Sequence, residues 1–274
     1  MSKVAAIQMA SGPNVQSNFD SAAKLIDVAV KKDAKLVVLP ENFALMAMTD
    51  EDRVSQAEQS GKGVMQDFLA NQSRKHGIWL VGGTIPLKSD VDGKARAACL
   101  LFNDKGEQVA RYDKIHMFDV VLGDNSESYN ESRTTDAGDQ AVVVDTPFGR
   151  LGLAVCYDLR FPELFRTMND YGMEICVLPS AFTAITGKAH WEPLVRARAI
   201  ENLCYMVASA QGGFHINGRE TYGHSMIVDP WGNILDRMPG GTGVIVADID
   251  KNFLKRTRKN FPVLQHRRLN CKIS

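Results

Sequence analysis

The chain has 274 residues, of which 45% are hydrophobic and 23% are charged. This length and composition allow a large packed core, in one large domain or two small ones. Lysine plus arginine number 32, as do aspartate plus glutamate, so the net charge is zero. Because no basic run occurs either, we expect no nucleic-acid partner and no long-range steering of polyanions.

Targeting and redox signals point to a cytoplasmic protein. The N-terminus, MSKVAAIQMA, becomes polar too soon for a signal peptide, and no apolar run approaches the length of a membrane span. We therefore expect no membrane contact. An odd number of cysteines without a CxxC motif predicts reduced thiols. Only His215 and His224 come near ligand spacing, and loosely, so no metal or other cofactor is expected. The cysteines are Cys99, Cys156, Cys176, Cys204 and Cys271.

The first half of the chain alternates short apolar strands with helices. KVAAIQMA predicts a buried strand, and the next helix would be capped by Ser17 or Asn18. AKLVVLP predicts a second strand that leads to Glu41, followed by a polar loop with methionines. We then expect a helix over about 63–76, a strand over GIWLVGGTIPL and a hairpin over DGKARAACLLFNDKGEQVARYDK. Residues 115–140 lack periodicity, which favours a long functional loop.

The second half repeats this alternation. AVVVDTPFGRLGLAV predicts a strand, a turn and a strand, FPELFRTMNDYG a helix, and MEICVLPS a strand. TGKAHWEPLVRARAIENLCYMVASAQ predicts a long helix that runs into a strand. GHSMIVDPWGNILDRM predicts two strands around a Pro-Trp-Gly turn, and GVIVADID predicts a last strand before a basic helix. With no linker or composition break, we expect one α/β domain over 1–274 with a tail from about 261. Two mixed sheets with outer helices fit this order, although the strand order stays open.

The most informative stretch is GRLGLAVCYDLRFPELFR. Its apolar strand, LGLAV, ends at Cys156, and FPELFR predicts a helix start with Pro162 in the first turn. The strand would hold the sulfur rigidly, and the free N–H groups of a helix end would favour the thiolate. Burial opposes the charged form, so the sequence leaves the protonation of the thiol open.

Two other apolar strands lead to reactive side chains, Glu41 and Lys114. If the three strands are parallel neighbours, all three side chains meet at one edge of a sheet. The thiol of Cys156 could then attack a carbonyl or nitrile carbon, while the carboxylate moves protons and the ammonium stabilises the oxyanion. Taken singly, each residue type is more often structural than catalytic at such a position. Spacing alone therefore does not select this set.

Three motifs in order carry a resemblance to a known family. They are VVLPENF around Glu41, YDKIHMFD around Lys114 and GLAVCYDLRFPELFR around Cys156, and GKAHWEPLVRARAIEN and GHSMIVDPWGNIL agree with them. The sequence resembles the nitrilase, or carbon–nitrogen hydrolase, superfamily from Val4 to Ile249. The resemblance implies an αββα sandwich and a triad. Glu41 would be the general base, Lys114 the oxyanion stabiliser and proton relay, and Cys156 the nucleophile.

The resemblance also implies a second glutamate between the lysine and cysteine motifs. Glu131 matches that position best and Glu127 less well, because Glu127 lacks the pattern that follows. Glu131 would orient Lys114 or the attacking water, and its structural alternative is a solvated loop charge.

Other residues near the cysteine are candidates for substrate binding. Arg160 could bind a substrate carboxylate through two hydrogen bonds from its guanidinium group, or could instead form an ion pair with Asp158 or Glu163. Thr183 follows a strand at the same edge and could bind substrate through a hydrogen bond. His190 precedes a helix and could line the site, with packing as an equal alternative. The predicted substrate-binding residues are Tyr157, Arg160, Thr183 and His190.

Within the superfamily, AHWEPLVRARAIEN and CYDLRFPEL resemble the branch of omega-amidases and deaminated glutathione amidases. GRETYGHSMIVDPWG and HMFDV are more similar to the second group. The implied reaction, through a thioester, is hydrolysis of a primary amide or of the γ-glutamyl-type amide in the α-keto form of glutathione. The second substrate would give 2-oxoglutarate and cysteinylglycine. The family resemblance also implies a homodimer, with contacts through the helix after the cysteine and the C-terminal region.

Several alternatives share these residues. An omega-amidase acting on 2-oxoglutaramate, a nitrilase, a carbamoylase and a biotinidase-like hydrolase would use the same triad. A catalytically silent scaffold would not need all three side chains. A thiol redox sensor using Cys156 would need a resolving cysteine, which the sequence does not place.

Overall fold

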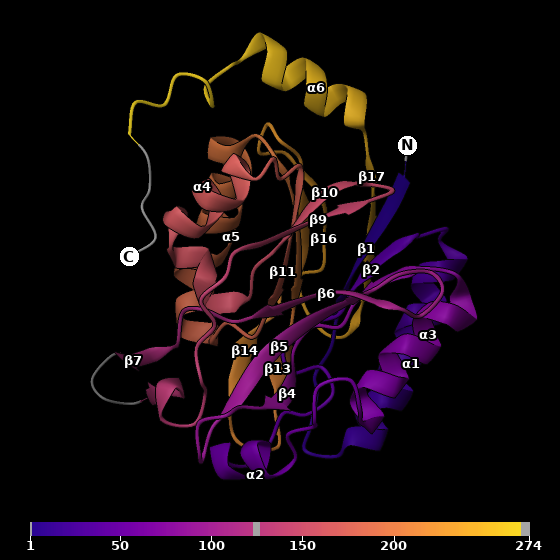
Figure 1. Cartoon of the computed structure of the whole chain (residues 1–274), viewed down its shortest axis with the longest axis vertical. Coiled ribbons are helices and arrows are strands. Elements are labelled where there is room, and N and C mark those ends of the chain that lie inside the picture. Colours follow the sequence, from indigo (N-terminus) through magenta and orange to yellow (C-terminus); the bar gives the residue numbers. More distant parts are fainter. Residues whose placement is uncertain (1, 123–126, 270–274) are drawn as a thin grey trace.

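Two mixed β-sheets pack face to face, with helices on their outer faces (Figure 1). The structure is a computed structural model that describes residues 2–122 and 127–269. In Figure 1, helices α1 (Val15–Lys31) and α3 (Val64–His76) lie on one side of the molecule. Helices α4 (Pro162–Asp170) and α5 (Ala184–Asn202) lie on the other side. This four-layer order confirms the predicted αββα sandwich.

The first sheet has the order β17-β1-β2-β3-β5-β4, with β6 also paired to β5. Strands β1, β2 and β3 are parallel, and the other pairs are antiparallel. Its strands are β1 (Ser2–Gln8), β2 (Leu36–Val38), β3 (Trp79–Val81), β4 (Ile85–Lys88), β5 (Ala95–Phe102), β6 (Gln108–Asp113) and β17 (Gly243–Ile249).

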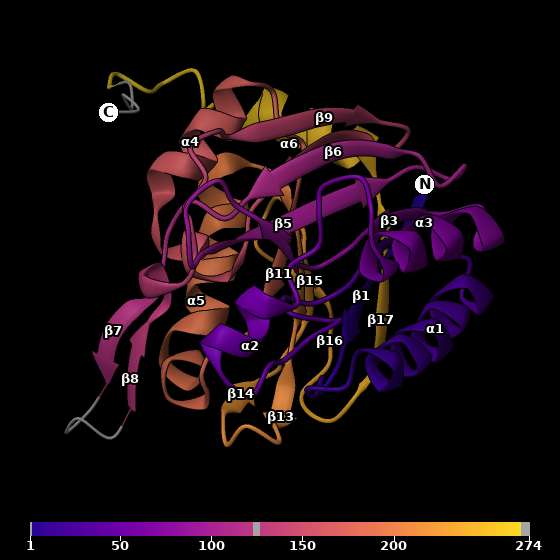
Figure 2. The same ribbon diagram turned by 60° about the horizontal axis from the view of Figure 1, so that its bottom comes forward.

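The second sheet has the order β16-β15-β12-β11-β10-β9, with a parallel centre of β10, β11 and β12. Its strands are β9 (Val142–Thr146), β10 (Gly149–Leu153), β11 (Ile175–Ser180), β12 (Tyr205–Ala210), β15 (Met226–Val228) and β16 (Ile234–Arg237). Two small hairpins stand apart, β7 (Asp119–Leu122) with β8 (Glu127–Asn130), and β13 (Gly212–Phe214) with β14 (Glu220–Tyr222). Figure 2 shows both at the lower end of the molecule.

The remaining helices are short or peripheral. Helix α2 (Asp50–Ser55) precedes α3, and α6 (Lys251–Asn260) crosses the top of the view in Figure 1. Two 3-10 helices, Glu131–Arg133 and Cys156–Arg160, hold residues of the predicted site. None of the helices in the described ranges has both the length and the apolar character to span a membrane.

Side-chain alternation in the first sheet divides the core in two. In β1, Val4 and Ala6 face the second sheet, whereas Ala5 and Ile7 belong to the cluster under α1 and α3. Strand β11 is buried along its whole length because the first sheet covers one face and helices cover the other. The central layer is therefore dry, so any charge placed there needs a partner.

Two glycines allow backbone segments to meet beside the predicted site. A Cβ at Gly83, which has a φ of +55°, would lie 2.0 Å from the carbonyl oxygen of Pro40, just before Glu41. A Cβ at Gly138 would lie 2.2 Å from the carbonyl oxygen of Asp113, just before Lys114. Only glycine fits at these contacts.

Local details differ from the sequence predictions in four places. Helix α1 begins three residues early, since Asn14 caps it by accepting from Ser17 N, and Asn18 is buried. GIWLVGGTIPL forms two strands, β3 and β4, because the chain turns at Gly83. The polar loop contains α2, which has a capping box at Thr49, and residues 115–140 contain the β7–β8 hairpin.

Candidate active site

The three predicted catalytic side chains come together, but not as neighbours in one sheet. Glu41 follows β2 and Lys114 follows β6, both in the first sheet, where β6 is not paired with β2. Cys156 follows β10 in the second sheet. The prediction of three parallel neighbours is therefore wrong. The residues meet across the two sheets, and all three line one cavity of about 390 Å³.

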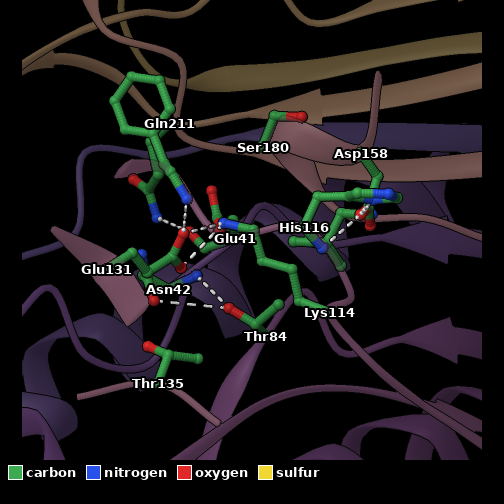
Figure 3. Close-up of polar contacts among 12 residues, drawn as sticks. Glu41, Asn42, Thr84, Lys114, His116, Glu131, Thr135, Asp158, Ser180 and Gln211 are labelled. Atoms are coloured by element: carbon green, nitrogen blue, oxygen red, sulfur yellow. Dashed lines mark hydrogen bonds and ion pairs between the residues drawn. The ribbon is translucent and has the colours of Figure 1, made fainter. Parts of the chain in front are cut away.

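The ammonium of Lys114 is buried between two carboxylates. Its Nζ lies 2.9 Å from Glu41 Oε1 and 2.9 Å from both carboxylate oxygens of Glu131 (Figure 3). Burial alone would lower the pKa of Lys114, but the charges of Glu131 and Glu41 outweigh it and hold that pKa above its usual range. Lys114 is therefore a permanent cation at physiological pH.

Glu131 occupies the place that the sequence predicted for a second glutamate. Besides Lys114, it accepts a hydrogen bond from the backbone N–H of Phe118 at 2.7 Å. Burial opposes its charge, but Lys114 and these hydrogen bonds hold the pKa of Glu131 below its usual value of 4.5. Glu127, the weaker candidate, accepts instead from the hydroxyl of Tyr129 at 2.8 Å.

Cys156 sits at a sharp turn with a left-handed backbone, φ +48°. Burial raises the pKa of its thiol well above the usual range, and the charge of Glu41 raises it further. Lys114 and the backbone N–H of Ala181 act in the opposite direction but do not compensate. The helix directly after the strand is one 3-10 turn, and α4 begins only at Pro162. On balance these effects favour the protonated thiol in the free protein.

A buried carboxylate, Asp158, joins the lysine and cysteine segments. Its oxygens accept from Tyr112 Oη at 2.6 Å, from Val155 N at 2.8 Å and from His116 N at 3.1 Å. The ring Nδ1 of His116 lies 2.7 Å from the same carboxylate (Figure 3). This network was not among the sequence predictions. The signal was present in the spacing, because Tyr112 and His116 flank Lys114 symmetrically.

The Glu41 segment is anchored from both sheets. Gln211, which follows β12, donates from Nε2 to the carbonyl oxygen of Glu41 at 3.0 Å. On the other side, Thr84 Oγ1 accepts from the backbone N–H of Asn42 at 2.9 Å (Figure 3). These contacts fix the carboxylate of Glu41 relative to Lys114 without using its oxygens.

Arg160 lines the cavity without a carboxylate partner among the described residues. Its guanidinium lies 5.6 Å from the ring centre of Tyr157 and 5.1 Å from that of Phe182. Its Nη1 is 3.2 Å from Nδ1 of His190. The alternative ion pair with Asp158 or Glu163 is not formed. The positive charge of Arg160 is therefore available to a ligand.

The other predicted binding residues have different positions. Tyr157 lines the cavity, its ring 5.1 Å from that of Phe118. Thr183 also lines it and caps α5 by accepting from Thr186 N. His190 does not line the cavity. It lies on an exposed part of α5 and reaches the site only through Arg160.

A group of cavity residues on the two small hairpins was not among the predicted site residues. Tyr129 belongs to β8, and Asn217 and Arg219 lie between β13 and β14. No local pattern marks them, because their approach to the site depends on how the hairpins fold back. Within the described residues, no three His, Cys, Asp or Glu side chains gather as metal ligands would.

A family model for carbon-nitrogen hydrolases matches residues 3–259. The chain belongs to the carbon-nitrogen hydrolase family. This carbon-nitrogen hydrolase is 43% identical over 266 residues to a Yersinia enterocolitica protein named deaminated glutathione amidase, covering 97% of this chain and 92% of that protein. A human protein of the same name is 41% identical over 268 residues, with 97% and 82% covered.

Solved structures agree with the family assignment. The carbon-nitrogen hydrolase superposes on the C. elegans NitFhit protein with a TM-score of 0.90 and 38% identity, over 97% of this chain and 65% of that one. It therefore spans about two thirds of that larger protein. Saccharomyces cerevisiae Nit3, a member of branch 10 of the nitrilase superfamily, gives a TM-score of 0.87 and 32% identity, with 98% and 97% covered. The predicted family and fold are confirmed.

Replacing Lys114 with Met should reverse the pH dependence of stability. In the wild type, the pKa of Glu131 is lower in the folded state, so its contribution is lost as pH falls below about 4.5, the usual value. In Lys114→Met, two buried carboxylates lose their cation, and burial then raises their pKa. Stability should fall by about 3–5 kcal/mol at neutral pH and recover as acid protonates the carboxylates. Urea unfolding at about pH 7 and about pH 5 measures both effects.

Lys75→Met is the matched control. Lys75 is exposed and lies 3.9 Å from Asp27, so its loss should change the free energy of unfolding by less than about 1 kcal/mol at either pH. If the free energy of unfolding changes with pH in the same way in Lys114→Met and in the wild type, the pairing of Lys114 with Glu41 and Glu131 does not govern stability.

Proposed function

We propose that this carbon-nitrogen hydrolase is an amidase that cleaves the amide bond of deaminated glutathione through a thioester on Cys156. The observation that carries the proposal is the buried Lys114 ammonium, held between Glu41 and Glu131 in the cavity that Cys156 also lines. The curated relatives of that name support the choice of substrate, since they match nearly the whole chain at 41% and 43% identity.

In the first half of the reaction, Glu41 takes the thiol proton as the sulfur of Cys156 attacks the amide carbon. The high thiol pKa makes this proton transfer necessary, because the free protein holds little thiolate. The carbonyl π electrons move to oxygen, and the ammonium of Lys114 stabilises the resulting oxyanion together with the N–H of Tyr157. Collapse of this intermediate breaks the C–N bond, and Glu41 returns the proton to the leaving amine.

In the second half, water replaces the amine. Glu41 takes a proton from water, the hydroxide attacks the thioester carbon, and the thiolate leaves and recovers its proton. The ammonium of Lys114 has three N–H groups, which reach one oxygen of Glu41 and both oxygens of Glu131. The oxyanion can take over one N–H from Glu131, which still holds the ammonium through its other oxygen. Glu131 holds Lys114 in that orientation.

Arg160 fits the carboxylate on the acyl side of the substrate. Deaminated glutathione carries a 2-oxo acid at that end, and the Arg160 guanidinium lines the cavity four residues after Cys156 without an acid partner in the described chain. Packing against the rings of Tyr157 and Phe182 limits its freedom, so less entropy is lost when it binds an anion.

The wild type should hydrolyse deaminated glutathione with a higher kcat/KM than 2-oxoglutaramate, a carbamoyl amino acid or a nitrile. Cys156→Ala should lose turnover by about 10⁴-fold or more, because the nucleophile is gone. Steady-state assays of ammonia or amine release measure both. Rapidly quenched wild type should also carry an acyl adduct on the Cys156 peptide, detected by mass spectrometry.

Cys204→Ala is the control, because Cys204 is buried away from the cavity and should not affect turnover. Full activity of Cys156→Ala would refute the mechanism. A preference for one of the other three substrates would refute the substrate assignment and leave the mechanism in place.

Arg160→Gln should lower kcat/KM for 2-oxoglutaramate about 10- to 100-fold, mainly through KM, because a hydrogen bond to a charged group contributes about 1.5–3 kcal/mol. The same variant should hydrolyse butyramide, which lacks the carboxylate, within about threefold of the wild-type rate constant. Steady-state kinetics on this substrate pair give the answer. Equal losses on both substrates would assign Arg160 to packing.

We further propose that the protein forms a homodimer in the cytoplasm. In support, large apolar side chains are exposed in the segments that the family resemblance implies, with Tyr171 48% and Phe261 49% accessible. The described cysteines are all free, as a reducing compartment would keep them. Light scattering should give twice the chain mass of 30.2 kDa. A single-chain mass at assay concentration would contradict the dimer.

A further inference from the structure

A second arginine without an acid partner lines the cavity. Arg219 lies in the turn between β13 and β14, on a different element from Arg160. Its guanidinium lies 5.2 Å from the ring centre of Tyr129, and its buried Nε has no hydrogen-bond partner. The ring, rather than a protein carboxylate, therefore sets the position of this charge.

Most other charges of the cavity are neutralised by neighbours. Lys114 pairs with Glu41 and Glu131, and Arg133 pairs with Glu51. Arg53, also in the lining, donates to the hydroxyls of Thr134 and Thr135. In the described part of the chain, Arg160 and Arg219 form no ion pair with a carboxylate, and neither donates to a threonine hydroxyl as Arg53 does. An uncompensated cation in a partly dry cavity favours an anionic ligand.

A band of aromatic rings separates the two arginines. From Arg160, contacts run to Tyr157, then to Phe118 at 5.1 Å between ring centres, then to Tyr129 at 5.0 Å, and on to Arg219. Three rings thus lie between the guanidinium groups along this wall. The cavity therefore offers two cationic ends joined by an apolar surface, which suits an elongated ligand with a carboxylate at each end.

The turn that carries Arg219 is held firmly to the body of the protein. Asn217 Oδ1 accepts from the backbone N–H of Arg219 at 3.2 Å, and Asn217 Nδ2 donates to the carbonyl of Ala47 at 2.8 Å. The ring of His215 bridges Ser11 and Thr221, 2.8 Å from each. Arg219 is thus placed before a ligand arrives, which reduces the entropy lost on binding.

We propose that Arg219 binds a carboxylate on the amine side of the scissile amide, so that the enzyme selects amides whose leaving group is an acidic peptide rather than ammonia. This inference rests on the proposed function for the reaction and for the acyl end of the substrate. It adds a specificity residue for the leaving group, opposite Arg160. An amidase that only releases ammonia would have no carboxylate on its leaving group for a second cation to bind. A second binding arginine therefore distinguishes this site from that of an ammonia-releasing amidase.

The test compares deaminated glutathione with the same compound after its glycine carboxylate is converted to a carboxamide. Arg219→Gln should lower kcat/KM for the acid about tenfold or more, the effect of losing a charge-assisted hydrogen bond, and change it less than about threefold for the carboxamide. Arg219→Lys should retain part of the preference for the acid over the carboxamide, because lysine keeps the positive charge but cannot donate the two parallel hydrogen bonds of a guanidinium group.

Arg133→Gln is the matched control. It removes the same charge from the cavity rim, but Arg133 is already paired with Glu51 and Asp50, so the preference for the acid should persist. If Arg219→Gln slows both substrates equally or leaves both unchanged, Arg219 only shapes the hairpin and the inference is overturned. In both cases wild-type turnover of deaminated glutathione would leave the proposed function intact.

If the wild type hydrolyses neither compound, the proposed function fails, and a binding assay decides the role of Arg219 separately. Serylglycine, a stand-in for the leaving dipeptide, should slow alkylation of Cys156 by iodoacetamide, and serylglycine amide should not. Arg219→Gln should abolish this protection. Equal protection by the acid and the amide would overturn the inference.

Discussion

An ammonium buried between two β-sheets constrains the whole structure. Lys114 cannot remain charged in the dry layer unless two carboxylates come within hydrogen-bonding distance, since an unpaired buried charge costs several kcal/mol. Glu41 arrives from β2 and Glu131 from the segment after the β7–β8 hairpin. The strand order, the close approach at Gly83 and the position of the 3-10 helix that begins at Glu131 must therefore all be correct before the charges balance.

Asp158 places a similar constraint on the other side of the cavity. Its buried carboxylate receives donors from both segments that carry the reactive groups, Tyr112 and His116 beside Lys114 and Val155 beside Cys156. A shift of one sheet relative to the other would remove the donors of Tyr112 and His116 and leave this carboxylate with the local N–H of Val155 alone. The partly buried Glu131, which contacts Lys114, and the buried Asp158, which binds the residues on either side of it, thus fix the lysine segment and link the alignment of the sheets to the geometry of the site.

The sequence was informative where the signal is local or where a motif covers the residue. LGLAV before Cys156, the Pro162 helix start and the hairpin before Lys114 follow from periodicity and turn residues, and the motif match singled out Glu131. It was not informative about contacts between distant segments. Cys156 lies in the opposite sheet from Glu41 and Lys114, His190 is exposed, and Arg219 approaches the cavity. These positions depend on which face of each element packs inward. In α5, apolar residues occur all round the helix and do not reveal that face.

The protonated state of Cys156 has a consequence for the lifetime of the enzyme. Peroxides and soft electrophiles react with thiolates far faster than with thiols. Burial and the charge of Glu41 favour the protonated sulfur, so in the resting protein this side chain should react more slowly with such reagents than an exposed thiolate. The same environment that makes the nucleophile depend on Glu41 thus slows its oxidation between catalytic cycles.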